Sequence, residues 1–294
     1  KTTGLNSLSI KFSALVFLLT VLASTVIAFA MLALQQDVLI NQEHAELEQT
    51  TTRYARQLDN EFWQKEKKAI SANQVVTRFF QQQQFTAEHQ AEAYADGSLR
   101  SKDDLSAAFQ QQQKFVSKPH GYFQQTGQLW QQLAPVLLED FFNFYFISKE
   151  QFIRISPADW ALQVSSQHDF NQDLFYTLAT PEQNPTRQPR WTPVYFDDIW
   201  KKWMTSLIIP LYIQDEFIGV TGVDYILDDI ISQLPASADK QTQAFLFDQN
   251  GLIISLPPAD LNSQLQMNSR YTGLPQQNAA LQHFANQVAR QPEA

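Results

Sequence analysis

The chain has 294 residues, no cysteine and a formal net charge of −9 at neutral pH. Without cysteine there is no disulfide scaffold, so an ordinary hydrophobic core must hold the fold, which this length can supply. The excess of carboxylates argues against nucleic acid as a partner and leaves cations and zwitterions as possible ligands.

The first predicted element is a transmembrane helix over residues 12–34. No charged residue interrupts this stretch, and at 1.5 Å per residue it extends roughly 35 Å, enough to cross a hydrocarbon layer of ~30 Å. A cleaved signal peptide is the alternative, with a small-residue site at 28–30, but the apolar run of a signal peptide is usually shorter. Lys1 and Lys11 precede the span and acidic residues follow it. The positive-inside rule therefore places 1–11 in the cytoplasm and the rest beyond a bacterial inner membrane, in the periplasm.

A long helix is predicted over 36–84, because this stretch lacks Pro and Gly and its apolar residues recur near helical spacing. Pairing of this helix with a second copy would make the protein a homodimer. Two or three further helices are expected in 87–138, interrupted at Asp96-Gly97. The glutamine tracts at 81–84 and 110–113 are interpreted as solvated helix surface.

From Phe141 onward the pattern changes to strands. The run F-F-N-F-Y-F-I over 141–147 and the run over 151–157 flank a short polar turn, which predicts a hairpin. The runs over 204–213 and 217–225 predict a second hairpin. Four or five antiparallel strands with the long helix on one face make an α+β arrangement. Pro210 suits an edge strand or a bulge, and Gly219 and Gly222 allow close approach to the backbone.

A short helix over 226–234 and a linker over 235–240 are expected to end this first module, which spans 85–234. A second module of the same type is expected over 241–294, beginning with a hairpin that turns at Asn250-Gly251. Too few residues remain to complete it, so the chain is expected to be a piece of a longer protein.

These features together resemble a known family. A long membrane-proximal helix, W-T-P-V-Y-F-D over 191–197, P-L-Y-I-Q-D-E-F-I-G-V-T-G-V-D-Y over 210–225 and F-L-F-D-Q-N-G-L-I-I-S over 245–255 occur in this order. The order is similar to the double Cache (dCache) sensor domains of bacterial chemoreceptors, histidine kinases and diguanylate cyclases. The resemblance implies a membrane-distal PAS-like module that binds a small ligand, an incomplete membrane-proximal PAS-like module, and signalling through helices to a cytoplasmic output domain.

The resemblance also implies ligand-binding residues. Trp191, Tyr195 and Asp197 match the stretch that lines the site in members that bind amino acids or amines, and Asp224 matches the acid that takes the ligand ammonium. Their chemistry is suitable, because a half-buried carboxylate pairs with an ammonium and aromatic faces add cation–π attraction. The residues alone also allow a purely structural role, with the aromatics in the core and Asp197 capping a turn. Tyr212 is a further candidate.

One departure from the family pattern affects the expected ligand. Amino-acid-binding members carry an Arg followed by Trp-Tyr on a helix, where this chain has Asp173, Leu174, Phe175 and Tyr176. An α-amino acid would then lose the partner of its carboxylate. The predicted ligand is a cation without a carboxylate, such as a biogenic amine or polyamine, with Asp173 as a second anchor and Tyr176 beside it.

Enzymatic functions find little support in the sequence. The five histidines are scattered without H-E-x-x-H spacing, and there is no nucleophile elbow or phosphate-binding glycine loop, so no metal, cofactor or catalytic residue is predicted. A membrane-anchored hydrolase using Asp197, Asp198 and Asp224 is one alternative. A structural or partner-binding ectodomain without a small ligand is another. Any kinase or cyclase activity would belong to other parts of a longer protein.

Overall fold

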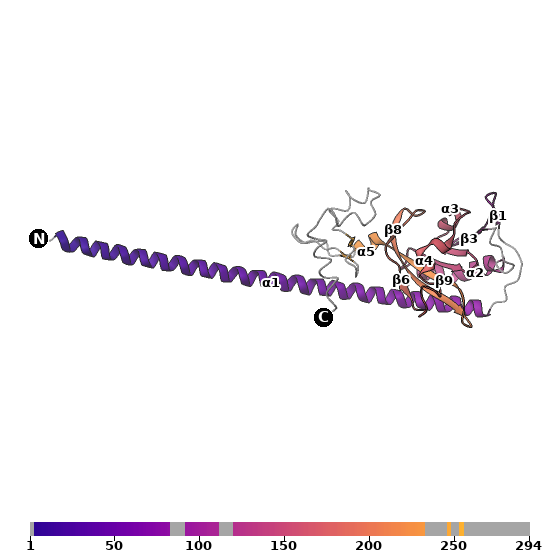
Figure 1. Ribbon diagram of the computed structural model, residues 1–294, viewed down its shortest axis with the longest axis horizontal. Coiled ribbons are helices and arrows are strands. Elements are labelled where there is room, and N and C mark those ends of the chain that lie inside the picture. The colour runs from indigo at the N-terminus through magenta and orange to yellow at the C-terminus, as the bar shows by residue number, and fades with distance from the viewer. Residues whose placement is uncertain (1–2, 83–91, 112–119, 233–245, 248–252, 256–294) are drawn as a thin grey trace. The chain divides into compact units, whose positions relative to one another are not determined.

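The computed structural model describes residues 3–82, 92–111, 120–232, 246–247 and 253–255. The chain divides into two compact units, Lys1–Asn60 and Glu61–Ala294. Helix α1, Thr3–Gln82, is continuous through this boundary, which confirms the predicted long helix up to its last described residue. Figure 1 shows α1 and, in the second unit, the sheet with its labelled helices.

The N-terminal part of α1 is long and apolar enough to cross a membrane. Its best window has a mean hydropathy of 2.6, and none of that window is buried against protein. The hydroxyls in this stretch bond within the helix: Thr20 donates to the Val16 carbonyl at 3.1 Å and Ser24 to the Thr20 carbonyl at 2.8 Å. Such bonds satisfy a hydroxyl where no water is available.

The second unit is built on an antiparallel sheet of nine strands in the order β1-β2-β3-β5-β4-β9-β8-β6, with β7 also paired to β8. The strands are β1 (Glu92–Ala93), β2 (Ser98–Lys102), β3 (Ala107–Gln111), β4 (Asn143–Ser148), β5 (Phe152–Ser156), β6 (Arg190–Trp191), β7 (Tyr195–Asp197), β8 (Lys202–Ile213) and β9 (Glu216–Ile226). Both predicted hairpins are present as β4–β5 and β8–β9. The α+β fold class is confirmed, although the sheet has more strands than predicted.

Helices cover both faces of the sheet. The helices are α2 (His120–Leu137), α3 (Asp159–Gln163), η2 (Phe170–Gln172), α4 (Leu174–Thr177) and α5 (Leu227–Ser232). One hydrophobic cluster joins the sheet to α1 and α2, through residues such as Val76 and Trp130. A second cluster joins the opposite face to α3, η2 and α4, through residues such as Trp160 and Phe170. Because side chains alternate along a strand, Phe144 belongs to the first cluster and Tyr145 to the second.

The prediction of helices throughout 87–138 is wrong, because residues 92–111 form β1, β2 and β3 and only α2 is helical among the described residues there. At the predicted break, Asp96 accepts from the Ser98 amide at 3.0 Å and Gly97 has φ 82°, which makes a tight turn between β1 and β2. Gln110 and Gln111 are buried in β3, not on a solvated helix. Their amides donate to the carbonyls of Glu150 and His168 at 3.2 and 2.6 Å, so a polar tract fits inside the fold.

The second predicted module lies mostly outside the described residues. Strands β10 (Leu246–Phe247) and β11 (Ile253–Ser255) pair antiparallel, as the predicted hairpin requires. The Asn250-Gly251 turn itself and residues 256–294 are outside the described part of the chain. In the first module, Pro210 lies beyond the pairing of β8 with β6 and one residue before a register shift at Leu211/Tyr212, in agreement with a proline near an edge or bulge.

Candidate functional site

A small cavity lies on the face of the sheet that α3 and α4 cover. Its lining comes from strands β4, β5, β7 and β9 and from helices α3 and α4. The residues are Asn143, Tyr145, Ile153, Ile155, Trp160, Phe175, Tyr195, Asp197 and Asp224. Its volume is about 10 Å³, room for about one water molecule. The cavity brings together three of the predicted ligand residues, Tyr195, Asp197 and Asp224.

Asp224 is the most deeply buried acid of this cavity. Asp224 lies on β9 directly between Asn143 of β4 and Ser206 of β8, and 4% of its surface is exposed. Asn143 Nδ2 donates to its Oδ2 at 2.7 Å, while its Oδ1 makes no hydrogen bond to any described residue. Burial raises the pKa of Asp224 to about 7, although the nearby Ser206, Asn143 and Tyr145 groups oppose the shift. The carboxylate is therefore charged only at a cost, and a cation in the cavity would relieve that cost.

Two tyrosines border Asp224. The Tyr195 hydroxyl lies 2.8 Å from Ser206 Oγ. The Tyr145 ring lies against Gly222, where an added Cβ would come within 2.2 Å of its Cζ. The predicted close approach at Gly222 is thus confirmed, because only glycine leaves room for this ring. Burial raises the pKa of both tyrosines well above the ordinary value, and the charge of Asp224 raises it further.

Asp197 has two structural tasks as well as a place in the cavity. Its Oδ1 accepts from the amides of Ile199 and Trp200 at 2.9 and 2.7 Å, which is the turn cap considered from the sequence. Its Oδ2 accepts from Trp160 Nε1 at 3.0 Å. Both oxygens therefore already have donors. Asp198, the other acid of the hydrolase alternative, has a side chain that is 91% exposed.

Asp173 lies at the start of α4 and does not line the cavity. Its Oδ2 is 2.6 Å from His168 Nε2. Burial raises the pKa of Asp173, while the hydrogen bond and the charge of His168 lower it and the charge of Asp197 raises it. Tyr176 is buried in the hydrophobic cluster that joins the sheet to α3, η2 and α4, with its ring 6.3 Å from that of Phe217. It is also absent from the cavity lining.

Trp191 and Tyr212 lie away from the cavity. The Trp191 ring is on the α1 face of the sheet, 5.3 Å from Phe62 and 5.6 Å from Tyr225, centroid to centroid. This is the core position that the sequence allowed as an alternative. Tyr212 lies near the end of the β8–β9 hairpin, where the Arg187 guanidinium is 4.1 Å from its ring centroid.

Sequence reasoning missed four residues of the lining that carry polar or aromatic groups: Asn143, Tyr145, Trp160 and Phe175. A signal existed for Asn143, which is the single amide in the aromatic run over 141–147. A polar residue in such a run is expected to have a buried partner, and that partner is Asp224. Trp160 comes from the short helix α3, which the sequence pattern did not predict.

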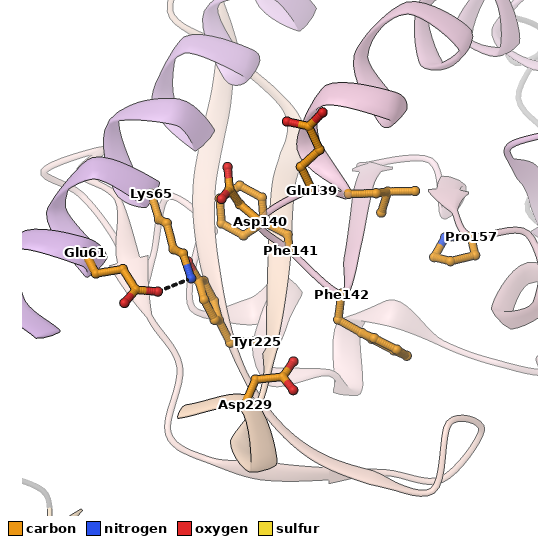
Figure 2. A pocket seen from close by; sticks show the side chains of 10 residues that line it. Glu61, Lys65, Glu139, Asp140, Phe141, Phe142, Pro157, Tyr225 and Asp229 are labelled. Carbon is orange, nitrogen blue, oxygen red and sulfur yellow. Dashed lines mark ion pairs between the residues drawn. The ribbon is translucent and has the colours of Figure 1, made fainter. Parts of the chain in front are cut away.

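A larger cavity of about 550 Å³ is lined by Glu61 and Lys65 of α1 and by Tyr225, whose ring packs on the α1 face of the sheet. Figure 2 shows Glu61 and Lys65 on the helix facing Tyr225, with Phe141 and Phe142 beyond. Lys65 Nζ is 2.5 Å from Glu61 Oε1 and 4.6 Å from the Tyr225 ring centroid. Among the described residues no cluster of His, Asp or Glu has the arrangement of a metal site.

Comparisons with known proteins found one matching family model and several similar solved structures. Residues 122–232 match the family model of the methyl-accepting chemotaxis protein-like first PDC sensor domain. No curated protein sequence matches the chain. Solved structures with a similar fold include the ligand-binding domain of the Pseudomonas aeruginosa PAO1 amino acid chemoreceptor PctB in complex with L-Gln, at 18% identity over 45% of this chain and 53% of that chain, with a TM-score of 0.39.

Two further structures have comparable likeness. The ligand-binding domain of the Pseudomonas fluorescens chemoreceptor CtaA in complex with L-valine is 22% identical over 48% of this chain and 59% of that one, with a TM-score of 0.37. The ligand-binding domain of the Campylobacter jejuni chemoreceptor Tlp3 in complex with L-norvaline is 19% identical over 52% of this chain and 60% of that one, with a TM-score of 0.35. The matched region thus spans between about half and three fifths of these chains.

The family match runs from within α2 to the end of α5 and includes every strand that contributes to the cavity. The matched family is a sensor domain. Residues 122–232 of this chain are therefore similar to the first PDC sensor domain of methyl-accepting chemotaxis protein-like receptors.

Proposed function

We propose that this protein is the extracytoplasmic sensing region of a bacterial transmembrane receptor, and that its sensor domain binds a small ammonium-bearing ligand at Asp224. One observation supports the ligand chemistry most directly. Asp224 is buried beside a cavity, one of its oxygens has no hydrogen bond to a described residue, and the cavity lining contains no Lys or Arg. A buried carboxylate without a cationic partner is costly, and an ammonium ligand supplies that partner.

The ligand is an amine rather than an α-amino acid. The solved relatives are described with L-Gln, L-valine or L-norvaline bound, and such ligands carry a carboxylate that needs a donor or a cation. In this chain Asp173 occupies the position expected for the arginine of amino-acid-binding members, and the lining offers carboxylates, hydroxyls and aromatic rings. A second amino group of a diamine would have to reach beyond the cavity lining to Asp173, whose carboxylate contacts His168.

One residue of β9 connects the cavity to α1. Asp224 faces the cavity, and the next residue, Tyr225, faces the other side of β9, as alternation along a strand requires. Its ring is 5.5 Å from Phe62 of α1 and lies under Lys65 of the same helix. A ligand that draws β4, β8 and β9 together around Asp224 therefore moves a residue that packs directly on α1, and the population of helix positions shifts.

The remaining parts of the proposal follow from the sequence. Residues 12–34 span the inner membrane, 1–11 are cytoplasmic, and the modules 85–234 and 241–294 lie in the periplasm. Residues 36–84 pair with a second copy, and the helix displacement reaches a cytoplasmic output domain of chemoreceptor, histidine kinase or diguanylate cyclase type. Disulfide trapping between cysteines introduced along 44–62 tests the displacement, because cross-linking rates would change in saturating ligand.

Calorimetry tests the ligand class. The full chain in lipid nanodiscs is titrated with an amine panel (putrescine, histamine, phenethylamine) and an amino-acid panel, alongside Asp224→Asn as the control that removes the charge. Binding of an amine that disappears in Asp224→Asn supports the proposal. Tight binding of amino acids with none of amines contradicts it. A thermal midpoint that no ligand raises would favour the alternative of a structural or partner-binding ectodomain.

A further inference from the structure

A buried polar side chain of α1 is hydrogen-bonded to the sheet. Asn73 is 8% exposed and lies on the same face of the helix as the buried residues Ala69 and Val76. Its Nδ2 donates to Thr221 Oγ1 of β9 at 2.7 Å and to the Ile209 carbonyl oxygen of β8 at 3.3 Å. A buried amide is costly unless its hydrogen bonds are made, so these two acceptors restrict where α1 can lie.

The two acceptors belong to neighbouring strands at one level of the sheet. Ile209 of β8 and Thr221 of β9 are directly opposite each other, and Thr221 Oγ1 lies 3.5 Å from the Ile209 carbonyl oxygen. Thr221 faces α1, whereas Asp224, three residues later on β9, faces the small cavity. Asn73 therefore contacts, from the α1 side, the same two strands that place Asp224 and Ser206 opposite each other.

A slide of α1 along the sheet would break this group of hydrogen bonds. A shift by one turn, about 5.4 Å, would bring Ala69 or Val76 to the two acceptors, because residues three or four apart share a helix face. Neither side chain can donate a hydrogen bond. Thr77, one turn beyond Asn73, uses its hydroxyl within the helix, where it donates to the Asn73 carbonyl oxygen at 2.8 Å. The displaced Asn73 amide would move among the apolar side chains that join α1 to the sheet.

We propose that Asn73 fixes the register of α1 on the sheet, so that this part of the helix keeps its position along β8 and β9 with and without ligand. In coiled coils a single buried asparagine selects one register in the same way, at some cost in stability. The consequence for signalling rests on the proposed function. Ligand-driven movement of α1 takes place around Phe62 and Lys65, which pack on Tyr225 beside the larger cavity, and not as a slide of the whole helix along the strands.

Distances between two spin labels test the register. The chain has no cysteine, so cysteines introduced at Arg78 of α1 and Asp228 of α5, both exposed, carry the only labels. Asp229 lines the same cavity as Glu61, and Arg78 lies roughly 25 Å further along the helix axis at 1.5 Å per residue. A slide by one turn therefore changes the distance between the labels by up to about 5 Å. Pulsed electron paramagnetic resonance measures this distance on the full chain in nanodiscs.

The test variant combines Asn73→Leu with Thr221→Val, because replacing both partners of a buried hydrogen bond by apolar groups keeps the fold. Without ligand, the labelled chain is expected to show one narrow distance. The double variant is expected to show a second distance displaced by several ångströms, its population raised about 5- to 150-fold. Thr77→Val is the matched control, because it removes a hydroxyl that bonds only within α1 as printed by its contact with the Asn73 carbonyl, and it should keep the single distance.

A single, unchanged distance in the double variant would overturn the inference, because packing alone would then set the register. Asn73→Ala, which removes only the amide group, gives the same readout if the double variant does not fold. Saturating putrescine or phenethylamine should leave the distance of the labelled chain within about 1 Å of its ligand-free value, and a change by a full turn would also overturn the inference. If no amine binds, the proposed function fails, while the ligand-free comparison still decides the role of Asn73.

Discussion

Replacing Asp224 with asparagine should stabilise the ligand-free protein and remove part of its pH dependence. The folded-state pKa of about 7 lies about 3 units above the ordinary value of 3.8. At 1.36 kcal/mol per unit, keeping this carboxylate charged in the fold costs up to about 4 kcal/mol. Between about pH 4 and pH 7 the folded protein holds a proton that the unfolded chain has released. The free energy of unfolding therefore falls as the pH rises through this window.

The assay compares thermal midpoints of the full chain with and without Asp224→Asn at pH 5 and pH 8. The difference in free energy of unfolding between the variant and the wild type should grow by about 2 to 3 kcal/mol between these pH values. The reason is that the wild type loses stability over the two pH units from pH 5 to the folded-state pKa of about 7. For a domain of this size that corresponds to about 5 to 10 °C. Asp228→Asn, which removes an exposed carboxylate of α5, controls for the change in net charge. A difference between wild type and Asp224→Asn that is the same at both pH values would refute the reasoning.

Three further predictions use the same preparation. Amine affinity should be highest near pH 8, where Asp224 is charged and the amine is still protonated, and should fall about tenfold per unit below pH 7, as Asp224 takes up a proton; calorimetry at pH 5.5 and 8 that gives one Kd would contradict this. Gly222→Ala places a Cβ 2.2 Å from Tyr145 Cζ and should lower the free energy of unfolding by about 1 to 3 kcal/mol and amine affinity at least tenfold. Gly127→Ala, whose Cβ meets its nearest atom at 3.2 Å, is the comparison and should keep wild-type affinity. Trp191→Ala should cost about 2 to 4 kcal/mol of stability while leaving amine affinity unchanged, so a large loss of affinity in folded Trp191→Ala would place that residue in the site after all.

The sequence was most informative where strands are long and apolar. The β8–β9 hairpin could be predicted because its β-branched residues extend over two full strands around a short polar turn. Strands β1 to β3 could not, because they are two to five residues long and β3 carries the glutamines that suggested a solvated helix. The polarity of those side chains gave no indication that backbone carbonyls of distant residues would satisfy them.

For the site, the sequence named Asp197 and Asp224, which line the cavity, and Asp173, which does not. Asp224 and Tyr195 lie at the cavity, yet Trp191, only four residues from Tyr195, lies on the other face because it belongs to a different short strand, β6. Contacts that depend on register, such as the pairing of Asn143 with Asp224, join residues far apart in the chain. A single sequence contains the strands but not the order in which they pair.

The cavity of about 550 Å³ beside Tyr225 has a mechanical consequence for α1. A close-packed interface resists sliding, since any displacement forces atoms into contact or opens a void. Here Glu61 and Lys65 border open space instead of a filled core, whereas Val76, about three helical turns beyond Lys65, is fully buried. The packing of α1 is thus complete around Val76 and looser around Glu61 and Lys65, where the contacts of Phe62 and Lys65 with Tyr225 lie beside the cavity, so a small displacement of the helix costs least packing at this end.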